Sequence, residues 1–315
     1  MTPSTRTTES ASPTPRRRRR RGRIALTLAL LVFLSGAAVS GWAWWHGSIA
    51  GVALRPHCTA TASGSTAELD PEQAANAAVI AGIALRRGLP GRAATIGIAV
   101  AMQESKLRNL DGGDLDSSGL FQQRPSQGWG TVEQVRDPVH ATNAFYDVLV
   151  KIDGYQNLSV TAVAQQVQRS AFPTAYADHE PQARIWASTL TGYSPAALSC
   201  VLAAVPEAPA QAPGKGGLTP RAQALVTAAT TTTGRAGTAL AGGDGHAVRW
   251  APAAKEPTRT AWALAQWAVA SADALGVVAV EVDGKHWQRS ESTKGWTPLA
   301  GAGPGAGAVV VRVTP

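Results

Sequence analysis

Cysteine is scarce in this 315-residue chain, which has only Cys58 and Cys200. Two thiols cannot build a zinc cluster or a dense disulfide framework, so those classes of protein are excluded, although one bridge can form. Charged residues are also few, at 16%, whereas hydrophobic residues reach 44%. This composition supplies enough apolar material for a packed core and excludes a chain that is disordered throughout.

Excess charge of either sign is lacking outside the N-terminal tail. The formal net charge is +8, but residues 1–23 hold eight arginines against the single Glu9, and these account for nearly all of it. The body of the chain therefore lacks the basic surface that follows a phosphate backbone. We expect no nucleic-acid partner.

A long uncharged run extends from Ile24 to Trp45. As a helix it would be about 33 Å long, enough to cross a bilayer. Arginines flank its N-terminal side, and Trp42 and Trp44 lie near the other end. This pattern favours a single-pass plasma-membrane anchor with a cytoplasmic N-terminus and everything after Trp45 outside the cell.

Two features of this region have alternative interpretations. A cleaved signal peptide also has a cationic start, but this run is longer than usual and carries tryptophans where small residues mark cleavage. The run from Arg16 to Arg21 could contact nucleic acid, although juxtamembrane basic runs more often set topology and bind anionic lipids.

Export to an oxidising compartment makes the two cysteines informative. They bracket one segment of distinct composition, so we predict a disulfide between Cys58 and Cys200. Closing so long a loop stabilises the folded state by up to ~5 kcal/mol in the chain-entropy model. Two buried free thiols would be expected only if the topology were wrong.

Composition divides the chain into six segments. They are a cytoplasmic arginine-rich tail (1–23), a transmembrane helix (24–45), a stalk rich in small residues (46–69), a helical domain (70–200), a Pro/Gly/Ala linker (201–217) and a small C-terminal domain (218–315).

Helical patterns dominate the segment 70–200. Asp70 and Pro71 place a cap residue before a first-turn proline, which predicts a helix to Gly88. A second helix is predicted from Pro90 to Ser105, and its scarcity of polar residues implies burial. Because no convincing period-two alternation occurs between the cysteines, the predicted fold class is a mainly α domain after one transmembrane helix.

Helices near 218–229 and 260–275, with strands at 277–282 and 309–313, predict a small α+β C-terminal domain.

Candidate chemistry centres on Glu104, at the end of the second helix. Its helical neighbours Ala101, Val100 and Gly97 form a small apolar face. Desolvation and the negative end of the helix dipole would both raise the pKa of Glu104, which suits a general acid that protonates a glycosidic oxygen. On position alone, a structural glutamate bonded to loop amides is the commoner case.

Two short motifs change that interpretation. Glu104-Ser105 ends an apolar helix, and Ser118-Gly119-Leu120-Phe121-Gln122 follows about fifteen residues later. Together they resemble the ES and GLMQ motifs of soluble lytic transglycosylases and goose-type lysozymes. The resemblance implies a lysozyme-like fold over residues 71–190 and cleavage of the MurNAc–GlcNAc bond of peptidoglycan. The arrangement with an arginine tail is similar to membrane-anchored actinobacterial cell-envelope proteins.

The same resemblance assigns roles to individual residues. Glu104 matches the catalytic acid, while Gly119, Leu120 and Gln122 match the segment that lines the cleft. Phe121 stands where the family usually has methionine. Residues 168–173 and Tyr176 occupy the place of the family's AYNAG-type segment, with an aromatic ring near the saccharide, but match it poorly.

Other polar and aromatic residues nearby could contact a glycan. Gln122 and Gln123 could bond sugar hydroxyls, as could the neighbouring Ser118, and Trp129 could stack on a sugar ring. A tryptophan after a glycine-rich loop is as often the plug of a small core, so both readings of Trp129 stay open.

The reaction depends on whether a second carboxyl group is present. A lytic transglycosylase needs one: Glu104 protonates the leaving oxygen and then removes the proton of the C6 hydroxyl, closing a 1,6-anhydro ring. Hydrolysis needs a partner about 5 Å away for retention, or roughly 6.5–9.5 Å for inversion. Asp111, Asp114 and Asp116 are candidates, but their glycine-rich setting indicates Asx turns. Their spacing lacks the EF-hand pattern, so no metal or other cofactor is expected.

The C-terminal segment faintly resembles the D,D-peptidase-like modules found beside lysozyme-like domains. Such metallopeptidases hold zinc with His and Asp, but Arg249 stands at the Asp position and residues 309–313 contain no histidine. A binding or structural module is therefore expected. The sequence as a whole predicts a membrane-anchored peptidoglycan lytic transglycosylase. The alternative is a non-catalytic envelope protein that binds glycan or recruits partners through the same cleft.

Overall fold

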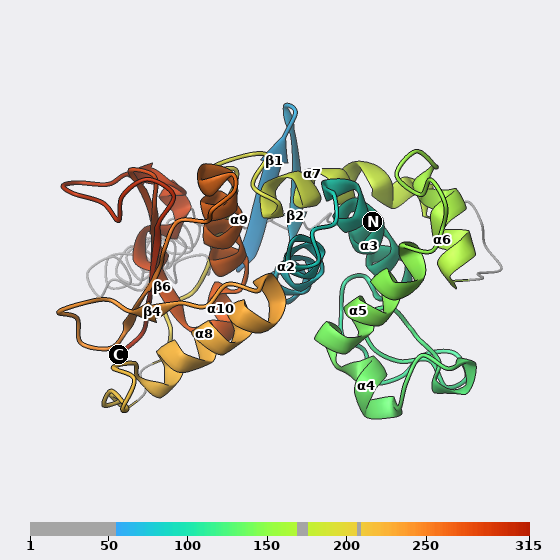
Figure 1. Ribbon diagram of the computed structural model, residues 1–315, viewed down its shortest axis with the longest axis horizontal. Coiled ribbons are helices and arrows are strands. Elements are labelled where there is room, and N and C mark those ends of the chain that lie inside the picture. Colours follow the sequence, from blue (N-terminus) through green and yellow to red (C-terminus); the bar gives the residue numbers. More distant parts are fainter. Residues whose placement is uncertain (1–54, 169–175, 207–208) are drawn as a thin grey trace, which may run out of the picture. The chain divides into compact units, whose positions relative to one another are not determined.

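The computed structural model describes residues 55–168, 176–206 and 209–315 (Figure 1). Residues 55–315 form one compact unit. Within these described ranges, no helix is both long and apolar enough to cross a membrane. The predicted anchor at 24–45 lies outside them.

A small antiparallel sheet opens the described chain. Its strands are β1 (His57–Ala62), β2 (Ser65–Leu69) and β3 (Leu198–Val201), in the order β2-β1-β3. Ser63 and Gly64 both have positive φ, 51° and 76°, which suits the tight turn that joins β1 to β2. The prediction of a mainly α fold without strands in this region is therefore wrong. The described residues instead combine helices with two antiparallel sheets.

The predicted disulfide is confirmed. Cys58 on β1 and Cys200 on β3 are register partners in the sheet and are bonded to each other, 142 positions apart in sequence. Both are fully buried. The disulfide therefore links β1, at the start of the unit, to β3, which follows the first group of helices.

The helices between β2 and β3 begin with α2 (Pro71–Arg86), for which the sequence gives clear signals. The Asp70 carboxylate accepts a 3.0 Å hydrogen bond from the amide of Gln73, and the Gln73 side chain accepts one from the amide of Asp70. This reciprocal cap confirms the predicted start of the helix. The other helices of this region are α3 (Gly91–Ser105), η1 (Pro125–Gln127), α4 (Val132–Arg136), α5 (Pro138–Leu149), α6 (Val160–Gln168), η2 (Ala177–His179) and α7 (Glu180–Leu190).

The chain then forms a larger sheet with order β4-β5-β9-β6-β7-β8. The predicted Asp283-Gly284 hairpin turn is confirmed, because Val282 pairs with Lys285 across it. The elements of this region are α8 (Pro220–Thr233), β4 (Thr238–Ala239), β5 (Ala247–Trp250), α9 (Pro257–Ala270), α10 (Ala272–Leu275), β6 (Val277–Val282), β7 (Lys285–Gln288), η3 (Arg289–Lys294), β8 (Thr297–Pro298) and β9 (Val309–Val313).

Helix α2 joins these two regions, since it contacts α3, α8 and α9 (Figure 1). Gln266 on α9 is fully buried and strengthens the junction. Its amide oxygen accepts hydrogen bonds from the backbone N–H groups of Ala197 and Leu198, and its amide nitrogen donates to Thr189 O at 2.6 Å. Among the described residues, one continuous hydrophobic core consequently extends from Cys58 to Val313.

Candidate active site

Glu104 lies in the last turn of α3 and is half-buried. The helix ends immediately afterwards, because Lys106 adopts a left-handed conformation with φ 55°. The hydroxyl of Tyr176 donates a 2.6 Å hydrogen bond to Glu104 Oε1. Tyr176 is only 1% exposed, so its hydroxyl is fixed by packing of the ring. The structure thus brings together two predicted site residues that are 72 positions apart.

A second contact joins α3 to η2, which directly follows Tyr176. Gln103 Oε1 and His179 Nε2 are 3.0 Å apart. Burial lowers the pKa of His179, and the nearby Asp178 carboxylate offsets this only in part. Neither Gln103 nor His179 is among the site residues predicted from the sequence. The available signal was their position, one residue before Glu104 and three after Tyr176.

Ser105 connects the two motifs on which the family resemblance rests. Its hydroxyl is 2.7 Å from the carbonyl oxygen of Leu120 and 3.0 Å from that of Ala101, and its proton is shared between these acceptors. Ser105 is buried. The end of α3 is therefore attached directly to the segment 118–123.

Backbone geometry explains why this segment needs a glycine. Gly119 has φ +78°, and a Cβ at this position would be 2.0 Å from the carbonyl oxygen of Val135. The next two side chains, Leu120 and Phe121, are fully buried, and Phe121 stacks on Phe145 with ring centroids 4.7 Å apart. The segment is accordingly held by packing against α4 and α5.

The other predicted glycan-binding residues differ in exposure. Ser118 and Gln123 are buried, and Gln123 donates to the carbonyl oxygen of Ala141 at 3.1 Å. Gln122 is half-buried, and its amide group bonds Gly119 O and Ser117 Oγ within its own loop. Trp129 is half-buried and packs against the hydrophobic core. Most of these residues are thus placed to shape the loop.

The three aspartates of the loop are engaged in different ways. Asp116 accepts a 2.7 Å hydrogen bond from Arg124 and a 2.8 Å bond from the backbone amide of Ser126, and these hold its pKa far below the usual range. Asp111 is exposed, and its Oδ1 is 3.7 Å from Nη2 of Arg136. The carbonyl oxygen of Asp114 accepts from Ser117 Oγ at 2.6 Å. In the described part of the chain, no group of three His, Cys, Asp or Glu side chains has a metal-binding arrangement.

Residues 169–173 of the poorly matching segment lie outside the described residues, whereas Gln168 is the last residue of α6 and Tyr176 directly precedes η2. No protein-family model matches the chain, and no curated protein matches it. The functional interpretation therefore rests on the site itself.

Proposed function

We propose that this protein cleaves peptidoglycan glycan strands, with Glu104 as the general acid and base. The observation that carries the proposal is the 2.6 Å hydrogen bond from the Tyr176 hydroxyl to Glu104 Oε1. A half-buried carboxyl group fixed by a rigid phenol has the defined orientation that proton transfer to a bound substrate requires. The direct bond from Ser105 to Leu120 adds support, because it joins the two motifs that resemble those of lytic transglycosylases.

In the proposed reaction, the Glu104 carboxyl group donates its proton to the glycosidic oxygen between MurNAc and GlcNAc. The C1–O bond breaks, and the resulting Glu104 carboxylate removes the proton of the C6 hydroxyl of the same MurNAc residue. The O6 oxygen then bonds to C1, which gives a 1,6-anhydro end and regenerates the acid. Tyr176 acts as a positioning residue that holds the carboxyl group through both proton transfers.

The proposed location of the reaction is outside the plasma membrane. The buried Cys58–Cys200 disulfide is compatible with an extracellular protein. The uncharged run at 24–45, preceded by arginines, would keep the unit at the membrane with its N-terminus in the cytoplasm. Glycan strands close to the membrane would then be the accessible substrate.

Non-catalytic glycan binding is the second candidate function, and one observation favours it. In the segment 118–123, the amide of Gln122 bonds Gly119 and Ser117, and the amide nitrogen of Gln123 bonds Ala141, while Ser118 Oγ and Gln123 Oε1 are buried. Few hydrogen-bonding groups of this segment are left to orient a sugar for reaction. A protein that only bound the glycan would also keep the Tyr176–Glu104 contact as a structural feature.

Muropeptide analysis separates the two functions. The full-length protein in a neutral detergent is incubated with purified peptidoglycan, and the soluble products are identified by mass spectrometry. The proposal expects fragments with 1,6-anhydro ends, and Asp111→Asn, Asp114→Asn and Asp116→Asn should each release them at nearly the wild-type rate. Reducing ends that depend on one of these aspartates would indicate a hydrolysing muramidase. Binding to the insoluble glycan without release of fragments would support the non-catalytic function.

A further inference from the structure

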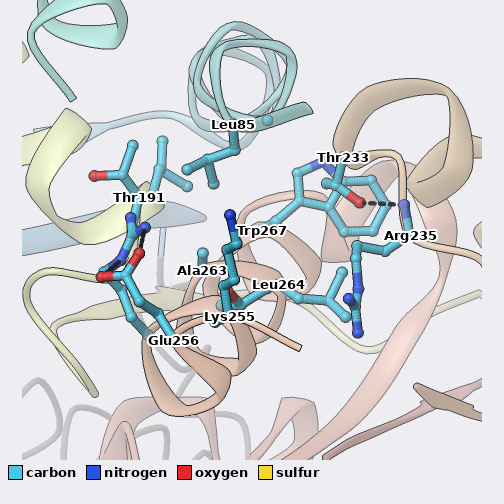
Figure 2. A pocket seen from close by; sticks show the side chains of 13 residues that line it. Leu85, Thr191, Thr233, Arg235, Lys255, Glu256, Ala263, Leu264 and Trp267 are labelled. Atoms are coloured by element: carbon cyan, nitrogen blue, oxygen red, sulfur yellow. Dashed lines mark hydrogen bonds and ion pairs between the residues drawn. The ribbon is translucent and has the colours of Figure 1, made fainter. Parts of the chain in front are cut away.

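A pocket of about 280 Å³ lies on a part of the molecule that the proposed reaction does not use (Figure 2). It is formed by the C-terminal ends of α2, α7 and α8 and by residues of α9 between Arg259 and Trp267. None of the residues that line it belongs to α3 or to the segment 118–123. The pocket is therefore a separate candidate site.

The walls of this pocket are mainly apolar. Leu264 and Trp267 on α9 are buried, and the remaining apolar wall consists of small or aliphatic side chains from α2, α7 and α9: Leu85, Leu190 and Ala263. Gly82 on α2 also lines the pocket. Its volume is close to the lower end of the roughly 300–1,000 Å³ found for small-molecule sites. An occupant would thus be a compact group, such as one ring or a short branched chain.

Positive charge is concentrated at the edge of the pocket. Lys255 and Arg235 both line it, and among the described residues neither forms an ion pair with a carboxylate. Figure 2 shows the Lys255 side chain extending across the pocket toward the side formed by Leu85. The carboxylate of Glu256 also lies at the edge but is already paired with Arg259, whose Nε is 2.9 Å from Glu256 Oε1.

Charge complementarity indicates which chemical class of ligand would fit this pocket. Two cations without carboxylate partners beside an apolar cavity favour a molecule with an anionic head and an apolar body. The guanidinium of Arg235 donates one hydrogen bond to Ala251 O at 2.5 Å, and its other N–H groups can form the paired bonds that a carboxylate accepts. The Glu256 carboxylate, next to Lys255, disfavours a head with two negative charges.

We propose that this pocket binds a carboxylate carried on a compact apolar group, with the apolar part against Trp267 and the carboxylate at Lys255 and Arg235. The inference does not depend on glycan cleavage, because the lining residues and those of the Glu104 site are different. The carboxylate can belong to a free small acid or to the C-terminus of a peptide that ends in an apolar residue.

Isothermal titration calorimetry on the full-length protein in a neutral detergent tests the proposal. The probes are 4-methylpentanoate, its uncharged amide, and N-acetyl-glycyl-leucine, each also titrated into protein-free micelles. We expect saturable binding of the carboxylates and at least ~10-fold weaker binding of the amide. Tighter binding of the peptide than of the free acid would identify a C-terminus as the source of the carboxylate, and the reverse order would identify a small acid.

Variants at the edge of the pocket localise the binding. Lys255→Gln and Arg235→Gln should each weaken 4-methylpentanoate binding by about 10-fold, since each removes one charged contact. Lys151→Gln changes an exposed lysine that does not line the pocket and should bind as the wild type does. The proposal is overturned if the carboxylates show no saturable binding, if the amide binds equally well, or if both edge variants retain wild-type affinity.

Discussion

The hydroxyl of Ser105 donates to the carbonyl oxygen of Leu120, 15 positions later in the chain, at 2.7 Å. Because both residues are buried, water cannot replace this bond without a rearrangement of the loop. The bond fixes the end of α3, where Glu104 lies, relative to the segment 118–123. The geometry of the candidate active site therefore depends on a serine that need not touch the substrate.

Ser105→Ala should destabilise the protein and loosen the attachment of the segment 118–123 to the end of α3. Loss of the hydroxyl leaves the buried Leu120 carbonyl without this donor, and the free energy of unfolding should fall by about 1–3 kcal/mol. Urea denaturation followed by circular dichroism measures the change, with Ser65→Ala on the exposed start of β2 as the control. An unfolding free energy equal to that of the control would show that the bond contributes nothing.

Tyr176→Phe isolates the positioning of the carboxyl group. The variant keeps the buried ring but removes the proton donated to Glu104, so kcat for release of glycan fragments should fall by about 10- to 100-fold while KM changes little. Tyr193→Phe, at an exposed tyrosine, should leave both constants unchanged. A rise in KM with kcat preserved would instead assign Tyr176 to substrate binding.

Removal of the disulfide should lower stability without abolishing the fold of the sheets. The double variant Cys58→Ala, Cys200→Ala should lose about 2–5 kcal/mol of unfolding free energy, because the reduced chain has a much less constrained unfolded state. Guanidinium denaturation under non-reducing conditions provides the comparison. An unchanged midpoint and slope would contradict a stabilising bridge.

The Arg92–Glu180 ion pair predicts a loss of stability in acid. Burial alone would raise the pKa of Glu180. The hydrogen bond and charge interaction with Arg92, whose Nη1 is 2.6 Å from Glu180 Oε1, and the interaction with Arg184 outweigh the effect of burial. The pKa of Glu180 therefore falls below the ordinary 4.5. The pair therefore stabilises the fold fully above about pH 4.5, and this contribution disappears as the pH falls through the folded-state pKa.

The Glu180→Gln variant should have a lower free energy of unfolding than the wild type at pH 7, and the difference between the two proteins should shrink by pH 3. Thermal unfolding at both pH values tests this, and a difference that grows in acid would reverse the sign of the argument.

The helices that surround Glu104 could be predicted because local signals agreed. Asp70, Pro71 and Gln73 specify the start of α2 by capping, and the scarcity of polar residues before Glu104 correctly indicated that α3 is buried. Strand β1 is not predicted by the sequence because its inward-facing residues after Cys58 are alanines, which give the segment the composition of a stalk. Its alternation of threonine with alanine was the available signal. The strand is specified by long-range pairing with β3 and by the disulfide, which local patterns do not show.

The site was only partly accessible to sequence reasoning for the same physical reason. Glu104 and Ser105 are adjacent and belong to one motif, so they could be recognised together. The contact of Glu104 with Tyr176 is tertiary, as is that of Gln103 with His179. The pocket beside Trp267 is built from residues between Gly82 and Trp267 that share no sequence pattern, and only folding brings them together.

The rate of glycan cleavage by Glu104→Gln tests the central claim most directly. Glutamine keeps the shape of the side chain and its oxygen can still accept the Tyr176 hydrogen bond, but it cannot transfer a proton. The account predicts a fall in the release of 1,6-anhydro muropeptides of about 100-fold or more, with an unchanged melting temperature. Glu68→Gln, at an exposed glutamate on β2, should retain the wild-type rate. Wild-type release of fragments by a folded Glu104→Gln variant would contradict the assignment of Glu104 as the catalytic acid and base.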